Sequence, residues 1–159
     1  MRQSTWPLER ELGMRWYASD GEGIGGRLRA TPSDFIVDEI PLEGKGGNAG
    51  PFLICRLTKK NWELQHAVKE IAKRLGISHR RIGWAGTKDR NAVTTQWISL
   101  YNVTPEQAAA VCLKDIMLEP LARSNEGLSL GDLLGNRFDI VIRDPDPAEL
   151  DSRVHSVSE

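Results

Sequence analysis

The segment NWELQHAVKEIAKRLG spans residues 61–76 and carries the strongest periodic pattern of the chain. Its apolar residues recur every three to four positions, which is typical of a helix with one buried face. These residues are Leu64, Val68, Ile71 and Leu75. Asn61 can cap the free N–H groups of the first turn, and Gly76 supplies a stop. The pattern therefore predicts an amphipathic helix between these two residues.

Segments on both sides of this helix predict the strands of a sheet. They are rich in β-branched and aromatic residues or form apolar runs, and turn-forming or charged residues bound them. The predicted strands are residues 34–42, 52–57, 81–85, 94–101, 116–122 and 137–143. A Gly-rich loop over residues 43–50 joins the first two strands.

Two further helices are predicted towards the end of the chain. Thr104-Pro105-Glu106-Gln107 has the sequence of a capping box and opens a helix that reaches Leu113. A last helix begins at Asp146, and its apolar stripe is still running at Glu159. Because this stripe meets no stop signal, we expect the chain to be a piece of a longer polypeptide.

Paired strands interleaved with single helices, without strict alternation of strand and helix, predict an α+β fold. Its sheet should be mainly antiparallel and flanked by helices. Residues 1–33 contain a Gly-rich loop over residues 20–26, so we expect an N-terminal arm followed by a flexible turn. Residues 34–159 should form the folded domain.

Charge and cysteine content narrow the class of protein. The chain has 159 residues, with 21 Lys and Arg against 22 Asp and Glu, so a polyanionic partner would need a local basic patch. Cys55 and Cys112 form no Cys-x-x-Cys pair, which favours reduced core thiols in a cytoplasmic protein over a zinc site. No segment approaches the ~18 apolar residues of a membrane helix, and no signal peptide is recognised, so we expect a soluble protein.

The loop GTKDR, residues 86–90, places the carboxylate of Asp89 between the cations of Lys88 and Arg90. Neighbouring cations keep a carboxylate ionised, as a nucleophile or general base requires. Spacing alone favours a plainer interpretation, in which Asp89 bonds its own turn and both cations are solvated. A Walker A loop needs a hydroxyl residue after the lysine, so nucleotide hydrolysis fits poorly.

Basic residues concentrate around the predicted helix and the loop that follows it. They are Lys69, Lys73, Arg74, Arg80, Arg81, Lys88 and Arg90. Such a concentration can bind RNA phosphates, and it fits a solvated helix face equally well. His66 and His79 lack the spacing of metal ligands, so they are interpreted as surface or packing residues and no metal site is expected. Trp84, Trp97 and Phe138 can stack on a base, although such aromatics more often belong to a core.

Three motifs occur in the order found in the tRNA pseudouridine synthase D (TruD) family. The central one is AGTKDRNAVTTQ at residues 85–96, which resembles the family's main motif. PSDFIVDE at residues 32–39 resembles the upstream Pro-x-Asp-Phe motif, and LGNRF at residues 134–138 resembles the downstream Gly-Asn-x-Phe motif. The chain is similar to this family from Gly25 to its last residue.

The resemblance implies roles for individual residues. The central Asp of the family is the catalytic nucleophile, which corresponds to Asp89. The residues implied in substrate binding are Phe35, Glu39, Lys88, Asn136, Phe138 and Arg29. At the last of these positions the family pattern has a Lys, and Arg29 keeps the charge while changing its shape and hydrogen bonding.

The implied reaction converts uridine to pseudouridine, at position thirteen of tRNA, without metal or cofactor. The uridine leaves the stack and lies on an aromatic such as Phe138, Asp89 attacks it, and the base turns and rejoins the sugar through C5. Whether Asp89 attacks the sugar or the base stays open, and so does the oligomeric state. Longer family members continue into an Asn-Tyr-Phe-Gly motif and an inserted domain. We therefore expect residues 34–159 to be the incomplete N-terminal portion of a pseudouridine synthase-like catalytic domain, inactive alone.

Two alternatives remain open at this stage. The chain could be a non-catalytic RNA-binding module that uses its basic surface and the loop at Asp89 for docking. It could also be a small structural domain that has no nucleic-acid partner. Salt-dependent binding of tRNA separates these two classes.

Overall fold

The computed structural model describes residues 2–17, 21, 23–42, 44 and 46–158. The chain forms two compact units, Met1–Arg27 with Ile142–Glu159, and Leu28–Val141. The predicted turn at residues 20–26 and the predicted loop at residues 43–50 include positions 20, 22, 43 and 45, which lie outside the described residues.

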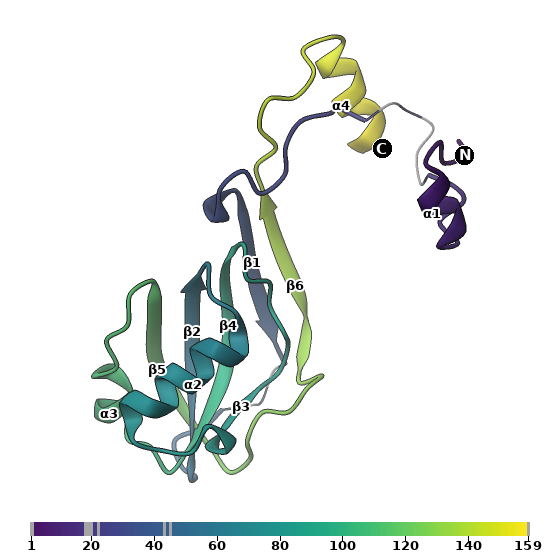
Figure 1. Ribbon diagram of the computed structural model, residues 1–159. Helices are drawn as coiled ribbons and strands as arrows, with labels where there is room; N and C mark the ends of the chain where they lie inside the picture. The colour runs from purple at the N-terminus through teal and green to yellow at the C-terminus, as the bar shows by residue number, and fades with distance from the viewer. Residues whose placement is uncertain (1, 18–20, 22, 43, 45, 159) are drawn as a thin grey trace. The chain divides into compact units, whose positions relative to one another are not determined.

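The unit Leu28–Val141 is built around a six-stranded sheet in the order β5-β2-β4-β1-β6, with β3 paired to β4 beside this path (Figure 1). The strands are β1 (Phe35–Pro41), β2 (Phe52–Lys60), β3 (Ile82–Trp84), β4 (Val93–Tyr101), β5 (Ile116–Ser124) and β6 (Leu133–Ile140). Among these strands of the described residues, only β1 and β4 pair in parallel. The predicted α+β fold with a mainly antiparallel sheet is confirmed.

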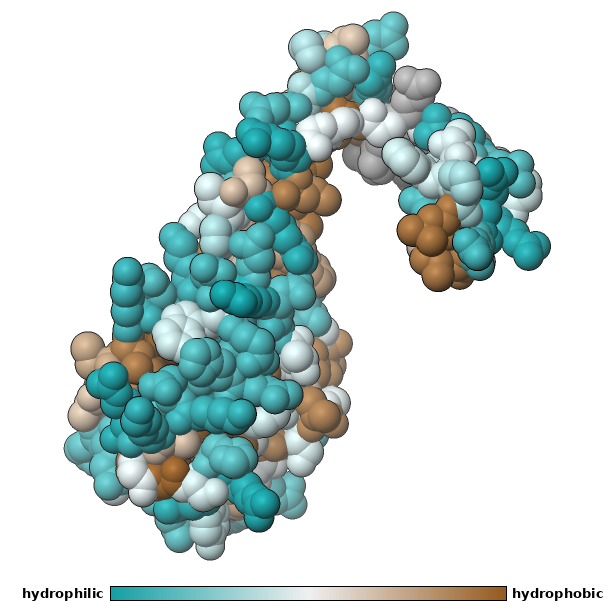
Figure 2. All heavy atoms as spheres, in the orientation of Figure 1, coloured by the Kyte–Doolittle hydropathy of each residue, from teal (hydrophilic) through white to brown (hydrophobic). Residues whose placement is uncertain are grey.

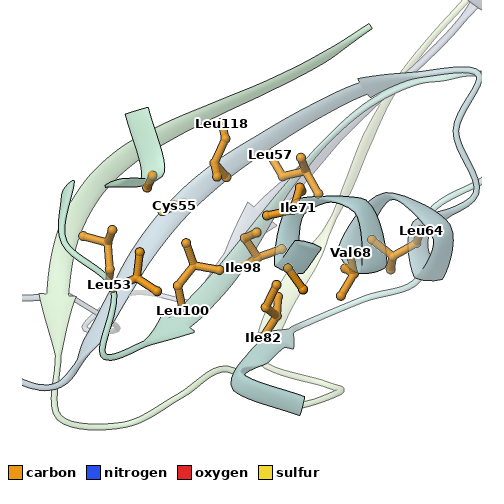
Figure 3. Packing of buried hydrophobic residues seen from close by; sticks show 13 residues of the cluster. Leu53, Cys55, Leu57, Leu64, Val68, Ile71, Ile82, Ile98, Leu100 and Leu118 are labelled. Atoms are coloured by element: carbon orange, nitrogen blue, oxygen red, sulfur yellow. The ribbon is translucent and has the colours of Figure 1, made fainter. Parts of the chain in front are cut away.

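Helix α2 (Leu64–Leu75) covers one face of this sheet and completes the core. Figure 3 shows its buried side chains Leu64, Val68 and Ile71 against strand residues such as Leu57 and Ile98. Removing such apolar side chains from water stabilises a fold by about 25 cal/mol for each Å² buried. The predicted helix is therefore confirmed, with its apolar stripe in the core.

The predicted C-terminal end of α2 is correct, and its predicted N-cap is wrong. Gly76 ends the helix with a φ of 65°, a left-handed conformation that glycine adopts without steric cost. The N-cap is Glu63, whose carboxylate accepts the backbone N–H groups of Gln65 and His66. Asn61 was the wrong cap, because the chain takes a turn there with a φ of 57° before the helix begins.

Other boundaries also differ from the prediction. Helix α3 (Pro105–Ala109) has the predicted capping box but ends before Leu113, because that residue turns back to bridge Ile116. Strand β2 continues to Lys60 between its two partners, and β6 begins at Leu133. Short 3-10 turns occupy Pro32–Asp34 and His79–Arg81.

In the other unit, α1 (Pro7–Glu11) was not predicted, and α4 (Leu150–Ser158) begins later than Asp146. The carboxylate of Asp146 instead accepts the N–H of Ala148 in the turn before the helix. The prediction of two core thiols is half wrong. Cys55 is buried in the sheet unit, whereas Cys112 is exposed beyond the short helix α3.

Candidate active site

The sheet face that carries α2 also carries most of the residues singled out from the sequence. Side chains alternate between the two faces of a strand, and directly paired residues share a face. Phe35, Val37 and Glu39 of β1 therefore lie on one face with their β6 partners Ile140, Phe138 and Asn136. Val37 pairs with Thr94 of β4, and Thr94 pairs with Lys59 of β2. Lys59 lies two positions after Leu57, which packs in the core with α2, so all of these residues share the face that α2 covers.

Asp89 lies in the loop between β3 and β4, with about half of its side chain exposed (51 %). Arg29 donates a hydrogen bond to its Oδ2 at 2.6 Å. The guanidinium carbon of Arg29 also lies 3.8 Å from the centroid of the Phe35 ring, and Phe35 meets Phe138 edge to face at 6.0 Å. The structure thus brings a reachable carboxylate, a cation and two aromatic rings together.

Lys88 and Glu39 form a buried ion pair beneath this surface. Their Nζ and Oε2 atoms are 2.6 Å apart, and the two side chains are 4 % and 0 % exposed. The other carboxylate oxygen of Glu39 accepts the backbone N–H of Trp97 at 3.0 Å. Because Lys88 is paired with Glu39, the cation that binds the carboxylate of Asp89 is Arg29, and not Lys88.

Gly86 is required by the close packing around this ion pair. A Cβ atom at this position would lie 2.6 Å from Nζ of Lys88 and 3.0 Å from Oε2 of Glu39. The amide nitrogen of Gln96 donates to the carbonyl of Gly86 at 3.0 Å, which ties the start of the loop to β4. Residues of the central and upstream motifs are therefore packed against one another and joined by an ion pair.

Lys59 was not identified from the sequence. Its side chain is fully buried, and Nζ donates to the carbonyls of Trp62 and Asp89 at 2.8 Å and of Lys88 at 3.4 Å. Burial lowers the pKa of Lys59 to about 8. In the sequence, Lys59 lies two positions after Leu57, so it belongs to the same face if the strand continues that far. The predicted strand ended at residue 57, and the burial of Lys59 was therefore missed.

Asn136 and Phe138 lie on β6, paired with Glu39 and Val37 of β1, and both residues are exposed. Phe138 leaves 55 % of its surface open to solvent while its edge contact with Phe35 orients the ring. An exposed aromatic ring can stack on a flat, unstacked base.

Comparison with known proteins identifies the family of this chain. The family model described as tRNA pseudouridine synthase D (TruD) matches residues 11–159. The chain belongs to the TruD family. It is 46% identical over 149 residues to the probable tRNA pseudouridine synthase D of Methanococcoides burtonii, covering 92% of this chain and 34% of the relative. The corresponding Thermococcus onnurineus protein is 48% identical over 143 residues, with 90% and 34% covered.

The fold agrees as well. A crystal structure of the Methanosarcina mazei protein assigned as TruD superposes with a TM-score of 0.91 and 37% sequence identity. The match covers 99% of this TruD chain and 36% of that one. The chain spans about a third of the length of the curated relatives it matches.

The basic surface of this TruD chain is smaller than the sequence indicated. Figure 2 shows hydrophilic side chains gathered over the face of the sheet unit that carries α2. Five of the seven basic residues singled out from the sequence are exposed, namely Lys69, Lys73, Arg74, Arg80 and Arg90. Arg81 instead donates to the carbonyls of Tyr101 and Asn102, and Lys88 is buried. His66 and His79 are exposed, so their interpretation as surface residues is confirmed.

The two tryptophans that flank the loop lie in strands β3 and β4. Trp84 packs against the core, and Trp97 points to the opposite sheet face, where it lines a cavity of about 330 Å³. Three further cavities, of about 270 to 430 Å³, are likewise not lined by Asp89.

Two features are absent from the part of the chain that the structure describes. No helix there combines the length and the apolar character needed to cross a bilayer. Among the same residues, no three His, Cys, Asp or Glu side chains come together as a metal site.

Proposed function

We propose that the complete protein carrying this segment converts uridine to pseudouridine in tRNA, with Asp89 as the nucleophile. The proposal rests on the half-exposed carboxylate of Asp89, which accepts a hydrogen bond from Arg29. Arg29 lies over the ring of Phe35, and that ring contacts the exposed ring of Phe138. The names of the curated TruD relatives support the same reaction. Uridine thirteen is the proposed target, on the family resemblance alone.

The residues would act in a definite order. Arg29 donates a hydrogen bond to Oδ2 of Asp89 and so orients the carboxylate, and Oδ1 has no hydrogen-bond partner among the described residues. The target uridine leaves the RNA stack and lies on Phe138. Asp89 forms a covalent bond to the uridine, and the glycosidic bond between N1 and C1′ breaks.

The second half of the reaction restores the enzyme. The base turns, a bond forms between C5 and C1′, and the bond to Asp89 breaks. C5 loses its proton and N1 gains one, so the product is an isomer of the substrate.

The test is Asp89→Asn in the complete protein. Tritium release from C5-labelled uridine in a tRNA transcript measures turnover, and primer extension after carbodiimide treatment maps the modified position. We expect the variant to lose turnover while it still binds tRNA, because the change removes a charge and little volume. Asp115→Asn, at an exposed position in the loop before β5, is the matched control. Undiminished conversion by Asp89→Asn would end the assignment.

The exposed cations around α2 favour a second candidate, a non-catalytic RNA-binding module. It predicts tRNA binding that weakens as salt rises, with no pseudouridine formed by the complete protein. We also propose that residues 1–159 alone give no turnover, since they span about a third of the length of their relatives. The two free thiols favour a cytoplasmic location.

A further inference from the structure

Lys59 is a buried cation whose partners are main-chain atoms. It lies near the end of β2, opposite Thr94 of β4 and Ile116 of β5, and none of its surface is exposed. A buried ammonium is costly unless its protons are taken up by acceptors. Its three N–H donors meet three carbonyl oxygens, so the charge is satisfied without a carboxylate partner.

The carbonyls that it binds belong to the loop that presents Asp89. Two of the three are those of Lys88 and Asp89 themselves. Residues 85–92 form neither helix nor strand, so no ladder of backbone hydrogen bonds holds this loop. The carboxylate of Asp89 is held from outside by Arg29, and its own carbonyl is held from inside by Lys59.

We infer that Lys59 is a positioning residue that sets the backbone of Asp89 and thereby the direction of its carboxylate. The inference rests on the proposed function and adds to it. The third contact joins the same ammonium to the carbonyl of Trp62, in the turn before α2. Lys59 therefore fixes the position of the loop relative to the core helix. Reacting groups misplaced by about 1 Å lose on the order of 100-fold in rate, so a small shift of this backbone matters.

The ionisation of Lys59 predicts a pH dependence of the rate that a purely packing role would not give. Burial lowers its pKa to about 8; the charges of Glu63 and Asp89 act in the opposite direction, and that of Lys88 lowers it further. The ammonium form is therefore present at neutral pH and is lost as the pH rises through 8. A neutral amine has two N–H donors and a lone pair, so it cannot bind three carbonyls.

The experiment compares Lys59→Met with Lys60→Met in the complete native protein. Met keeps the length of the side chain and removes its charge, and Lys60 is an exposed neighbour on the same strand. Single-turnover rates on tRNA should fall at least tenfold in Lys59→Met and stay within about twofold in Lys60→Met. The Kd for tRNA should be unchanged in both. The alkaline fall in rate near pH 8 should be present in the unchanged protein and absent from Lys59→Met.

A second readout needs no activity. Trypsin cleaves after Arg90, which is exposed, and Lys59→Met should speed this cleavage by loosening the loop. If the unchanged protein does not modify tRNA, the proposed function fails, and the cleavage rates still judge the positioning. Equal rates of turnover and of cleavage in the two variants would overturn the inference. Should Lys59→Met fail to fold, an unchanged protein whose rate stays flat from pH 7 to 9.5 would overturn it too.

Discussion

The buried pair of Glu39 and Lys88 offers the sharpest test of how this site is built. Glu39→Gln removes the negative charge and leaves an amide oxygen that can still accept the N–H of Trp97. The ammonium of Lys88, 4 % exposed, then has no counter-charge. Removing one member of a buried ion pair costs about 3–5 kcal/mol, and near-zero exposure means that water cannot relieve the loss. We expect a loss of this size in the free energy of unfolding.

The converse change and the double change complete the test. Lys88→Met leaves the Glu39 carboxylate with the single N–H of Trp97, so its cost should be similar. With both changes together no charge stays unpaired, and the double variant should be more stable than the sum of the single effects predicts by about 2 kcal/mol or more.

Urea denaturation followed by tryptophan fluorescence measures these energies. Glu119→Gln is the control, because Arg56 and Glu119 form an exposed pair at 2.8 Å with side chains 46% and 36% exposed. That change should cost at most about 1 kcal/mol. Single variants of the buried pair that also cost less than about 1 kcal/mol, or costs that add without coupling, would refute the reasoning.

Three further predictions concern the same unit. Gly86→Ala should destabilise the protein by about 1–3 kcal/mol in the same denaturation assay, because its Cβ would enter the space of the buried ion pair. Burial raises the pKa of Cys55 to about 12, so iodoacetamide at pH 8 should modify only Cys112; two adducts by mass spectrometry of the native protein would contradict this. Arg29→Gln should lower the single-turnover rate on the order of tenfold by releasing the carboxylate of Asp89, and an undiminished rate would argue against that contact.

Local patterns in the sequence predicted the elements of the fold better than their ends. The stripe of α2 and the capping box of α3 depend on residues within a few positions, and both occur in the structure. The end of α3 depends instead on Leu113 bridging Ile116, which is a contact between elements. Helix propensity carries no information about such a contact, so the predicted helix was too long.

The same distinction holds for the site. Asp89, Phe35 and Phe138 were named from motifs, and the structure brings them to one face. Lys59 was missed because its partners lie up to 30 residues further along the chain. Spacing around a lysine cannot show that distant carbonyls will surround it, and a lysine ordinarily marks the surface.

The register of β6 has a consequence for how the protein is made. Phe35 pairs with Ile140 across about 100 residues of chain, whereas β2 and β4 meet after a much shorter loop. Contacts between distant segments form late, because closing a long loop costs entropy before any contact repays it. On the ribosome, the sheet that carries the Asp89 loop can therefore assemble first. The strand with Phe138 is made last, so the growing polypeptide has the carboxylate of Asp89 before it has the proposed stacking surface for a base.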